Sequence, residues 1–154
     1  MKISIITVSY NSASTIKDTF DSIRIQNYSD IEYIVIDGGS TDDTLNIIQK
    51  NKDIISKWIS ENDNGIFDAF NKGIALASGQ IIGILNSDDF YTNENVISDV
   101  IKAFLDFKVD SVYGNLFYVD PVNTSIIKRK WIDKNQYNRK RFKYDGCQPT
   151  QHFL

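Results

Sequence analysis

The sequence predicts an α/β fold in which helices flank a mostly parallel sheet and an antiparallel hairpin follows. Short β-branched runs alternate with amphipathic runs from residue 3 to residue 107. The β-branched runs are almost continuously apolar, as expected for parallel strands buried on both faces. After residue 110 the alternation gives way to two strand-like runs joined by a turn. Alternating strands and helices build right-handed βαβ units, so the sheet should be parallel up to that point.

The parallel part should contain a strand before each helix. We expect strands at residues 3–9, 31–36, 54–59 and 81–85. A first helix should be capped by Ser14 and bury Ile16, Phe20 and Ile23, which fall at helical spacing. Further helices are expected at about residues 42–50, 66–77 and 95–107.

Two glycines shape our expectation for the helix at residues 66–77. Phe70, Ile74 and Ala77 should form its inward face, and Gly79 should end it. Gly73 lies mid-helix, where glycine is unfavourable by about 1 kcal/mol relative to alanine. A glycine there indicates close packing against the sheet or a ligand, and we favour the sheet.

The last third of the chain should form the hairpin. Residues 111–119 and 124–131 read as two strands, and Asp120-Pro121-Val122-Asn123 between them has the composition of a turn. The pair should therefore be antiparallel.

Composition narrows the class of protein. The 154 residues fit one ordinary domain, and the net charge of −3 gives no electrostatic reason to expect nucleic-acid binding. The single cysteine, Cys147, excludes a disulfide framework within the chain and favours a reducing compartment. No apolar run approaches the roughly 20 residues of a membrane-spanning helix. We expect a cytoplasmic protein, with peripheral attachment to the inner face of the cell membrane left open.

Polar residues follow every predicted parallel strand. In such sheets, ligands bind beyond the carboxyl ends of the strands. All four segments at that edge are polar and three contain aspartate; they are Tyr10–Asn11, Asp37–Asp42, Glu61–Gly65 and Ser87–Asp89. This edge is therefore the predicted binding site.

Ser87-Asp88-Asp89 is the first candidate site. The sequence has neither a G-x-x-x-x-G-K-[ST] loop nor a G-x-G-x-x-G motif after the first strand, so phosphate needs another partner. Two adjacent carboxylates repel each other unless a cation or ligand satisfies them. Mg²⁺ or Mn²⁺ held by carboxylates and substrate phosphates would do so. The alternative is a turn that leads into a helix.

Asp37-Gly38-Gly39 begins the second candidate site. Glycine lets the backbone turn sharply and approach a ligand closely. The Asp37 carboxylate could accept the N–H of a pyrimidine base. The alternative is a strand-to-helix turn capped by Ser40 or Thr41, and both interpretations can hold together. The third segment, Glu61–Gly65, reads as a loop.

Five motifs in order resemble the family 2 glycosyltransferases of the Rossmann-like GT-A fold. The most similar kinds make bacterial capsule, O-antigen or exopolysaccharide. The motifs are Thr7-Val8-Ser9-Tyr10-Asn11, Asp37-Gly38-Gly39-Ser40-Thr41-Asp42, Asp63-Asn64-Gly65-Ile66-Phe67-Asp68-Ala69, Asn71-Lys72-Gly73 and Asn86-Ser87-Asp88-Asp89. The resemblance implies that residues 1–110 bind the nucleotide sugar. Residues 111–154 would form the hairpin and the start of an acceptor-side region of the same domain.

The resemblance also implies roles for individual residues. Asp37 would bind the base, Asp63 would lie beside the base or ribose, and Asp88 would contact ribose or sugar hydroxyls. Asp89 would hold the Mn²⁺ or Mg²⁺ ion. The remaining implied nucleotide-sugar-binding residues are Thr7, Ser9, Tyr10, Asn11, Gly39 and Lys72.

The implied activity is metal-dependent transfer of a sugar, with inversion, from a nucleoside-diphosphate sugar. A UDP-type donor is favoured, and the acceptor would be a saccharide or a lipid-linked hydroxyl in cell-surface polysaccharide synthesis. Inversion needs a general base. No motif identifies one, although Asp133 and Asp145 are available. We therefore expect the base beyond the chain end. The alternatives are a donor-binding fragment without catalysis and a nucleotidyltransferase, whose Gly-rich N-terminal loop is absent.

A basic, aromatic-containing segment at residues 128–143 remains. It could contact an anionic acceptor, a lipid diphosphate or a membrane surface. The favoured interpretation is a solvated hairpin and loop. His152, the only histidine, is expected in a loop rather than as a ligand.

Overall fold

The computed structural model describes residues 1–132 and the short strand at residues 152–153. These residues divide into two units, Met1–Val112 with Phe153–Leu154 and Tyr113–His152, and each unit is described separately. Asp133, Asp145, Cys147 and the basic residues beyond 132 lie outside the described residues.

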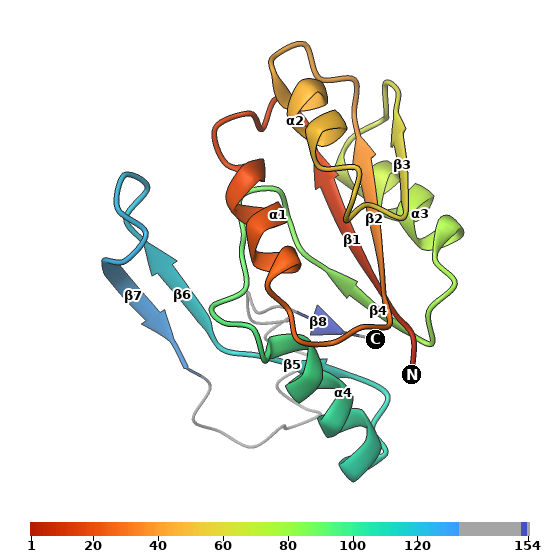
Figure 1. The fold of residues 1–154 in the computed structure, drawn as a ribbon, viewed down its shortest axis with the longest axis vertical. Helices are drawn as coiled ribbons and strands as arrows, with labels where there is room; N and C mark the ends of the chain where they lie inside the picture. Colours follow the sequence, from red (N-terminus) through yellow and green to blue (C-terminus); the bar gives the residue numbers. More distant parts are fainter. Residues whose placement is uncertain (133–151, 154) are drawn as a thin grey trace. The chain divides into compact units, whose positions relative to one another are not determined.

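The first unit is built on a mostly parallel sheet, which confirms the predicted fold class (Figure 1). Strand β1 pairs in parallel with β2 and β4, and β2 pairs in parallel with β3. Strand β8 is antiparallel to β4, with Phe153 opposite Gly83. The strand order is β3 (Lys57–Ser60), β2 (Ile31–Asp37), β1 (Ile3–Ser9), β4 (Ile81–Ile84), β8 (His152–Phe153) and β5 (Val112–Tyr113).

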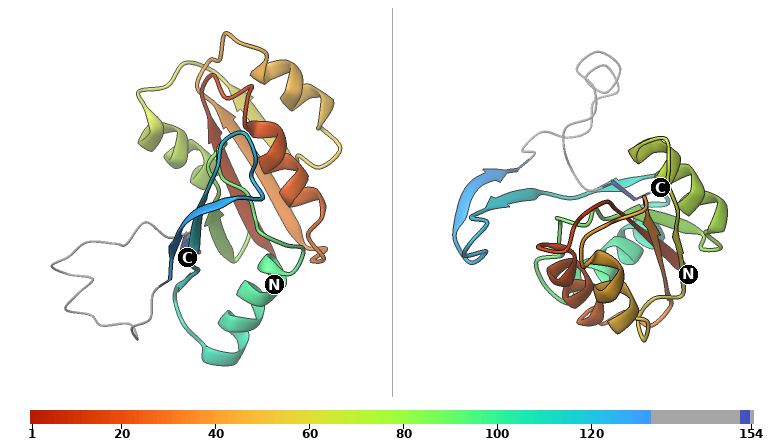
Figure 2. Two further views of the ribbon diagram at one scale, coloured as in Figure 1. Left: turned by 90° about the vertical axis from the view of Figure 1, so that its left-hand side faces the viewer. Right: turned by 90° about the horizontal axis from the view of Figure 1, so that it is seen from above.

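Helices cover both faces of the parallel strands. The helices are α1 (Ile16–Arg24), α2 (Thr44–Lys50), α3 (Ile66–Leu76) and α4 (Val96–Phe107). Phe20 of α1, Ile48 of α2 and Ile101 of α4 belong to one buried cluster, and Ala69 of α3 belongs to another. Figure 2 shows α3 on the opposite side of the sheet from α1 and α2.

Side chains of β1 alternate between the two buried clusters, one on each face of the sheet. Ile3 and Ile5 point into the cluster with α1, α2 and α4, whereas Ile6 and Val8 point into the cluster with α3. Successive side chains of a strand alternate between the faces of a sheet. A strand covered on both faces is therefore apolar at nearly every position, as the sequence indicates.

The structure confirms part of the expected inward face of α3, because Phe70 and Ala77 pack against the cluster that contains Ala69. Ala69 and Gly73 are its buried residues, whereas Ile74 is 44% exposed. A Cβ atom at Gly73 would lie 2.4 Å from Cγ2 of Ile6, so this position allows α3 to approach β1 closely. The helix ends at Leu76, one residue before the expected end at residue 77, and Gly79 lies against the backbone of Ser4.

Two local details also differ from the expectations. Helix α1 is preceded by Thr15 at its N-cap with no side-chain cap hydrogen bond, so Ser14 does not cap it. The third strand begins at Lys57 rather than at residue 54, because residues 51–54 form a turn after α2.

The second unit contains the predicted antiparallel hairpin, β6 (Leu116–Val119) and β7 (Ile127–Trp131). Oδ1 of Asp120 accepts hydrogen bonds from the backbone N–H groups of Val122 and Asn123, at 2.9 and 3.0 Å. These bonds form the turn, as side chains of aspartate commonly do. The expected strand at 111–119 is interrupted between Tyr113 and Leu116. Among the described residues no helix is long and apolar enough to span a membrane.

Candidate functional site

The ends of the parallel strands meet at one edge of the sheet, as the sequence predicts. Strands β1, β2 and β3 all run towards the top of Figure 1. A cavity of about 810 Å³ opens at this edge. Its lining comes from the segments after β1, β2, β3 and β4 and from the starts of α1 and α3. The lining residues are Val8, Ser9, Tyr10, Asn11, Ser12, Ser14, Thr15, Gly38, Asn62, Asp63, Gly65, Ile66, Ala69, Asn86, Ser87 and Asp88.

The segment after β1 is fixed by its contacts with the segment after β2. Asn11 has a φ of 50°, a left-handed conformation that asparagine tolerates better than most residues. Its Oδ1 accepts the backbone N–H of Thr41 at 2.9 Å, and its own N–H donates to Oγ of Ser40 at 2.8 Å. Tyr10 beside it lines the cavity and is 64% exposed.

Asp37 ends β2 and is fully buried. Oδ1 accepts hydrogen bonds from the hydroxyl groups of Ser9 and Ser40. Oδ2 accepts bonds from the N–H groups of Gly39 and Ser40, at 3.1 and 2.9 Å, and from Oγ of Ser60 at 2.8 Å. Both carboxylate oxygens are therefore occupied by protein groups. Asp37 does not line the cavity.

The glycine pair after Asp37 gives room to side chains from the β3–α3 loop. A Cβ atom at Gly38 would lie 2.7 Å from Oδ2 of Asp63. At Gly39 it would lie 2.3 Å from Oδ1 of Asn62, and Gly39 also has a φ of +82°, which favours glycine. The half-buried carboxylate of Asp63 lines the cavity, and its Oδ1 accepts the N–H of Gly65 at 2.8 Å.

Asp88 and Asp89 follow β4. Asp88 is exposed and lines the cavity, while Asp89 is half-buried. Burial and then the neighbouring charge of Asp88 raise the pKa of Asp89, and a hydrogen bond from Nδ2 of Asn86 at 3.2 Å partly offsets them. Within the described part of the chain, no three His, Cys, Asp or Glu residues are grouped to hold a metal ion. A cation bound here would therefore also need oxygen atoms from a bound substrate, such as those of a diphosphate.

Hydroxyl groups of Thr19, Ser12 and Ser87 hold the turn that carries these carboxylates. Oγ1 of Thr19, in α1, donates to the carbonyl oxygen of Asp89 at 2.8 Å. The hydroxyl groups of Ser12 and Ser87 are 2.8 Å apart. Asn86 belongs to the motif Asn86-Ser87-Asp88-Asp89, but no role was predicted for it. Ser12 and Thr19 were not singled out, and only the place of Ser12 near the end of β1 could have indicated it.

Besides Asp37, three residues expected to bind the nucleotide sugar do not line the cavity. Thr7 shares the face of β1 that carries Ile3 and Ile5, so it is fully buried with its hydroxyl 2.9 Å from that of Tyr33. Lys72 forms ion pairs with Glu61 and Asp68, at 2.8 and 3.2 Å. Gly39 instead directs its N–H to Asp37.

Comparisons with known proteins agree with this architecture. The profile of glycosyl transferase family 2 matches residues 4–153. An uncharacterized glycosyltransferase of Mycobacterium tuberculosis (strain H37Rv) is 39% identical over 102 residues, which cover 66% of this chain and 39% of that protein. The Escherichia coli enzyme WfaP, a UDP-Glc:alpha-D-GlcNAc-diphosphoundecaprenol beta-1,3-glucosyltransferase, is 38% identical over 121 residues, or 77% of this chain and 47% of the enzyme. The chain thus spans less than half the length of these relatives.

Solved structures show the same fold. Staphylococcus aureus TarS residues 1–349 superpose with a TM-score of 0.66 at 28% identity, over 72% of this chain and 34% of TarS. A mannosyltransferase from Pyrobaculum calidifontis, 24% identical, superposes with a TM-score of 0.68 over 80% of this chain and 37% of that enzyme. The strand order, the cavity at the strand ends and the profile match agree, and the chain belongs to glycosyl transferase family 2.

Proposed function

We propose that this chain is the donor-binding part of a metal-dependent glycosyltransferase. The donor is a nucleoside-diphosphate sugar, with a UDP sugar favoured, and the acceptor is a hydroxyl group of a saccharide or lipid-linked saccharide. The observation that carries the proposal is the carboxylate pair after β4, in which Asp88 lines the cavity and Asp89 is half-buried next to it. Burial, and then the neighbouring charge of Asp88, raise the pKa of Asp89. A cation bound with a diphosphate would compensate the two charges.

Relatives support the choice of donor. WfaP is named for UDP-glucose and for an acceptor linked to diphosphoundecaprenol. Crystal structures of TarS contain UDP or UDP-GlcNAc, and TarS is 27% identical to this chain in both. The cavity of about 810 Å³ falls within the range of 300–1,000 Å³ typical of small-molecule sites.

The residues present fit Mn²⁺ or Mg²⁺, with Asp89 as the ligand and Asp88 beside it. When bound, such an ion would supply charge neutralisation for the leaving nucleoside diphosphate. Asp88 would accept hydrogen bonds from ribose or sugar hydroxyls. Ser9, Tyr10 and Asn11 would line the nucleotide pocket at the end of β1. Direct displacement by the acceptor hydroxyl inverts the anomeric carbon and requires a base for the hydroxyl proton.

Calorimetry and a donor-turnover assay together test this function. UDP should bind in the presence of Mn²⁺ or Mg²⁺, and Asp89→Ala should weaken binding by more than about 100-fold. Loss of a residue that only supports a metal ligand already reduces affinity about 10- to 100-fold. The matched control is Asp43→Ala, an exposed aspartate outside the cavity. Equal UDP affinity without metal and in Asp89→Ala would contradict the metal site.

Turnover separates transfer from binding alone. Release of UDP from a UDP sugar, dependent on an added saccharide or lipid-linked acceptor, supports transfer by this chain. Metal-dependent UDP binding with no acceptor-dependent release would favour the alternative, in which the chain binds the donor without transferring its sugar.

A further inference from the structure

We infer that the β6–β7 hairpin docks on an anionic phospholipid surface, with the turn at residues 120–126 entering first. The charges of the chain are divided unevenly between its two units. Residues 1–112 contain 9 basic and 17 acidic residues, whereas residues 113–154 contain 8 basic and 3 acidic residues. The first part therefore has a net charge of −8 and the second a net charge of +5, which together give the −3 of the whole chain. An anionic surface would attract the hairpin and not the chain as a whole.

Three consecutive cations of β7 are exposed, namely Lys128, Arg129 and Lys130. Nζ of Lys128 forms an ion pair with Asp120 at 3.1 Å, and Asp120 is the only acidic residue between positions 111 and 132. Arg129 and Lys130 form no ion pair with another residue that the structure describes. Their charges are therefore available to an anionic partner such as the phosphates of lipid headgroups.

Both faces of the hairpin carry a cation beside an aromatic ring. Arg129 lies opposite Tyr118, and residues directly opposite each other share a face. Lys130 lies opposite Phe117 on the other face, because successive residues of a strand point to opposite faces. The guanidinium of Arg129 is 4.8 Å from the ring centroid of Trp131, and Nζ of Lys130 is 5.7 Å from that of Phe117. Cations on both faces suit end-on entry into a headgroup layer, because a flat contact would use only one of them.

The turn between β6 and β7 is apolar at its most exposed position (Figure 1). Val122 is 94% exposed, and Ile126 and Ile127 are 46% and 43% exposed. The sequence has no charged residue between Asp120 and Lys128. At a rise of about 3.3 Å per residue, the cations follow Ile127 within roughly 10 Å along β7. A headgroup layer is about 5–8 Å thick, so an apolar tip at its inner boundary would leave the cations level with the phosphates.

Hydrogen bonds within the turn reduce the cost of removing it from water. Oδ1 of Asp120 accepts the N–H groups of Val122 and Asn123. The N–H of Asp120 donates to the carbonyl oxygen of Ile126, and the N–H of Ile126 donates to that of Asn123, both at 2.9 Å. The N–H of Ser125 donates to Oδ1 of Asn123 at 3.1 Å. Because unsatisfied backbone groups oppose entry into lipid, a turn that satisfies its own N–H groups is suited to it.

Exposure alone would fit the solvated hairpin that the sequence favours. The charge division, the cations without a carboxylate partner and the uncharged apolar tip together favour a lipid surface. Basic residues beside apolar and aromatic side chains are typical of protein segments at membrane interfaces. A nucleic acid would use the same cations, but it would not use the apolar tip. The inference goes beyond the proposed function and does not depend on it.

Co-sedimentation of the whole chain with lipid vesicles tests the role of the cations. The chain should bind vesicles of phosphatidylcholine with phosphatidylglycerol, and it should not bind vesicles of phosphatidylcholine alone. Arg129→Gln/Lys130→Gln should weaken binding about 25-fold, because each cation near an anionic surface contributes about fivefold. The matched control Lys50→Gln/Lys102→Gln removes two exposed cations of the first unit and should keep wild-type binding. Raising the salt from about 0.1 to 1 M should release the chain, because the screening length falls from about 10 to 3 Å.

The apolar tip is tested separately. Val122→Ser should weaken binding to anionic vesicles about tenfold, because a valine side chain loses its burial in lipid. Val109→Ser is the matched control, since Val109 is a 41% exposed valine of the first unit. In a Trp58→Phe background Trp131 is the only tryptophan. Its fluorescence emission should shift to shorter wavelength with anionic vesicles and stay unchanged with neutral ones.

The outcomes separate this inference from the proposed function. Anionic-vesicle binding that is the same in Arg129→Gln/Lys130→Gln as in its control would overturn the inference. So would binding of a single-stranded oligonucleotide that needs these cations, in a chain that binds no vesicles. The hairpin residues changed here do not line the cavity, so circular dichroism and metal-dependent UDP affinity of each variant should match wild type. UDP binding without vesicle binding would remove only the docking surface, and vesicle binding without UDP binding would remove only the donor site.

Discussion

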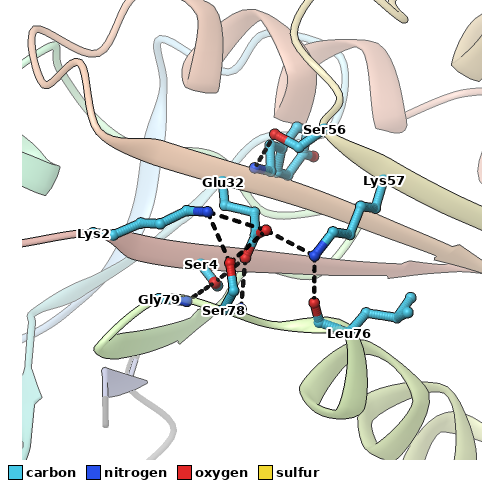
Figure 3. Close-up of polar contacts among 9 residues, drawn as sticks. Lys2, Ser4, Glu32, Ser56, Lys57, Leu76, Ser78 and Gly79 are labelled. Carbon is cyan, nitrogen blue, oxygen red and sulfur yellow. Dashed lines mark hydrogen bonds and ion pairs between the residues drawn. The ribbon is translucent and has the colours of Figure 1, made fainter.

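The pKa of a shielded carboxyl group is shifted in opposite directions at the two ends of the parallel sheet. At the amino-terminal end, Glu32 is 4% exposed and receives hydrogen bonds from Ser4, Ser78, Lys2 and Lys57 (Figure 3). Burial alone would raise the pKa of Glu32, but these bonds outweigh it and hold the pKa well below the ordinary value. At the carboxyl-terminal end, burial and Asp88 raise the pKa of Asp89.

This difference distinguishes a structural acid from a ligand-binding acid. The charge of Glu32 is satisfied by groups from β1, β3 and the loop before β4, so it ties these segments together. The charge of Asp89 has one weak donor, Asn86, and faces a second carboxylate. Such strain is typical of functional sites, where stability is lower until the ligand is bound.

Removing the charge of Asp89 should affect binding and stability in opposite directions. Asp89→Asn should lose more than about 100-fold in Mn²⁺-dependent UDP affinity. Because the fold disfavours the ionised form, the variant should melt up to about 3 °C higher than wild type at neutral pH without ligand. Calorimetry gives the affinity and scanning calorimetry gives the Tm. A lower Tm in the ligand-free variant would show that Asp89 stabilises the fold, contrary to the comparison.

Glu32→Gln should have the reverse pattern. Losing charge-assisted hydrogen bonds in a buried network should reduce the free energy of unfolding by about 2–3 kcal/mol. UDP affinity of the folded variant should stay within about twofold, because Glu32 is outside the cavity. Urea unfolding measures the first quantity and calorimetry the second. A large loss of UDP affinity would mean that the two ends of the sheet are coupled.

The Tm difference between wild type and Glu32→Gln should depend on pH. The folded-state pKa of Glu32 lies below its unfolded value of about 4.3, so its ionised form stabilises the fold above that pH. The stabilisation is lost as the pH falls towards the folded-state pKa. The Tm difference between wild type and Glu32→Gln should therefore be constant from pH 6 to 8 and narrow below about pH 4. A constant difference down to pH 3 would contradict the assignment.

The sequence indicated where the site lies better than what each residue does there. Asp88 lines the cavity at the predicted edge because ligands bind beyond the ends of parallel strands, a rule that needs only the strand order. The binding roles of Asp88 and Asp89 stay predictions. The hydrogen bonds that occupy both carboxylate oxygens of Asp37 depend on the register between strands, since Ser9 and Ser60 lie directly opposite Asp37 on β1 and β3. Pairing register between strands far apart in sequence is not visible in a single sequence.

One difference between the expected and the observed site could have been foreseen from the sequence. Thr7 follows Ile3 and Ile5 at a spacing of two, which places it on a buried face rather than in the cavity. The room that Gly38 leaves for Asp63 could not have been foreseen, because it depends on the path of the β3–α3 loop. The turn chemistry at Asp120, by contrast, is local and was predicted correctly.

The residues that hold the Asp89 turn should have intermediate effects. Thr19→Val removes the hydroxyl that bonds the carbonyl oxygen of Asp89 while keeping the shape of the side chain. It should weaken Mn²⁺-dependent UDP binding about tenfold, as expected for a residue that orients a metal ligand. It should also reduce the unfolding free energy by about 1 kcal/mol. Ser22→Ala is the matched control, because that buried hydroxyl bonds only within α1. Equal effects of the two changes on UDP affinity would remove the specific role of Thr19.

The smallest effects should come from the cations around Glu32. Side chains of Lys2 and Lys57 are 39% and 41% exposed, so solvent screens much of their attraction to Glu32. Lys57→Met and Lys2→Met should each reduce the unfolding free energy by about 0.3–1 kcal/mol. Lys57 should matter more, because its Nζ is 2.9 Å from Glu32 against 3.3 Å for Lys2, and it also donates to the carbonyl oxygen of Leu76. Urea unfolding at 0.05 and 0.5 M NaCl should show both effects shrinking with salt. If either lysine proves as important as Glu32 itself, the network depends on ion pairing rather than on the serine and backbone hydrogen bonds that distinguish it from the site at the other end.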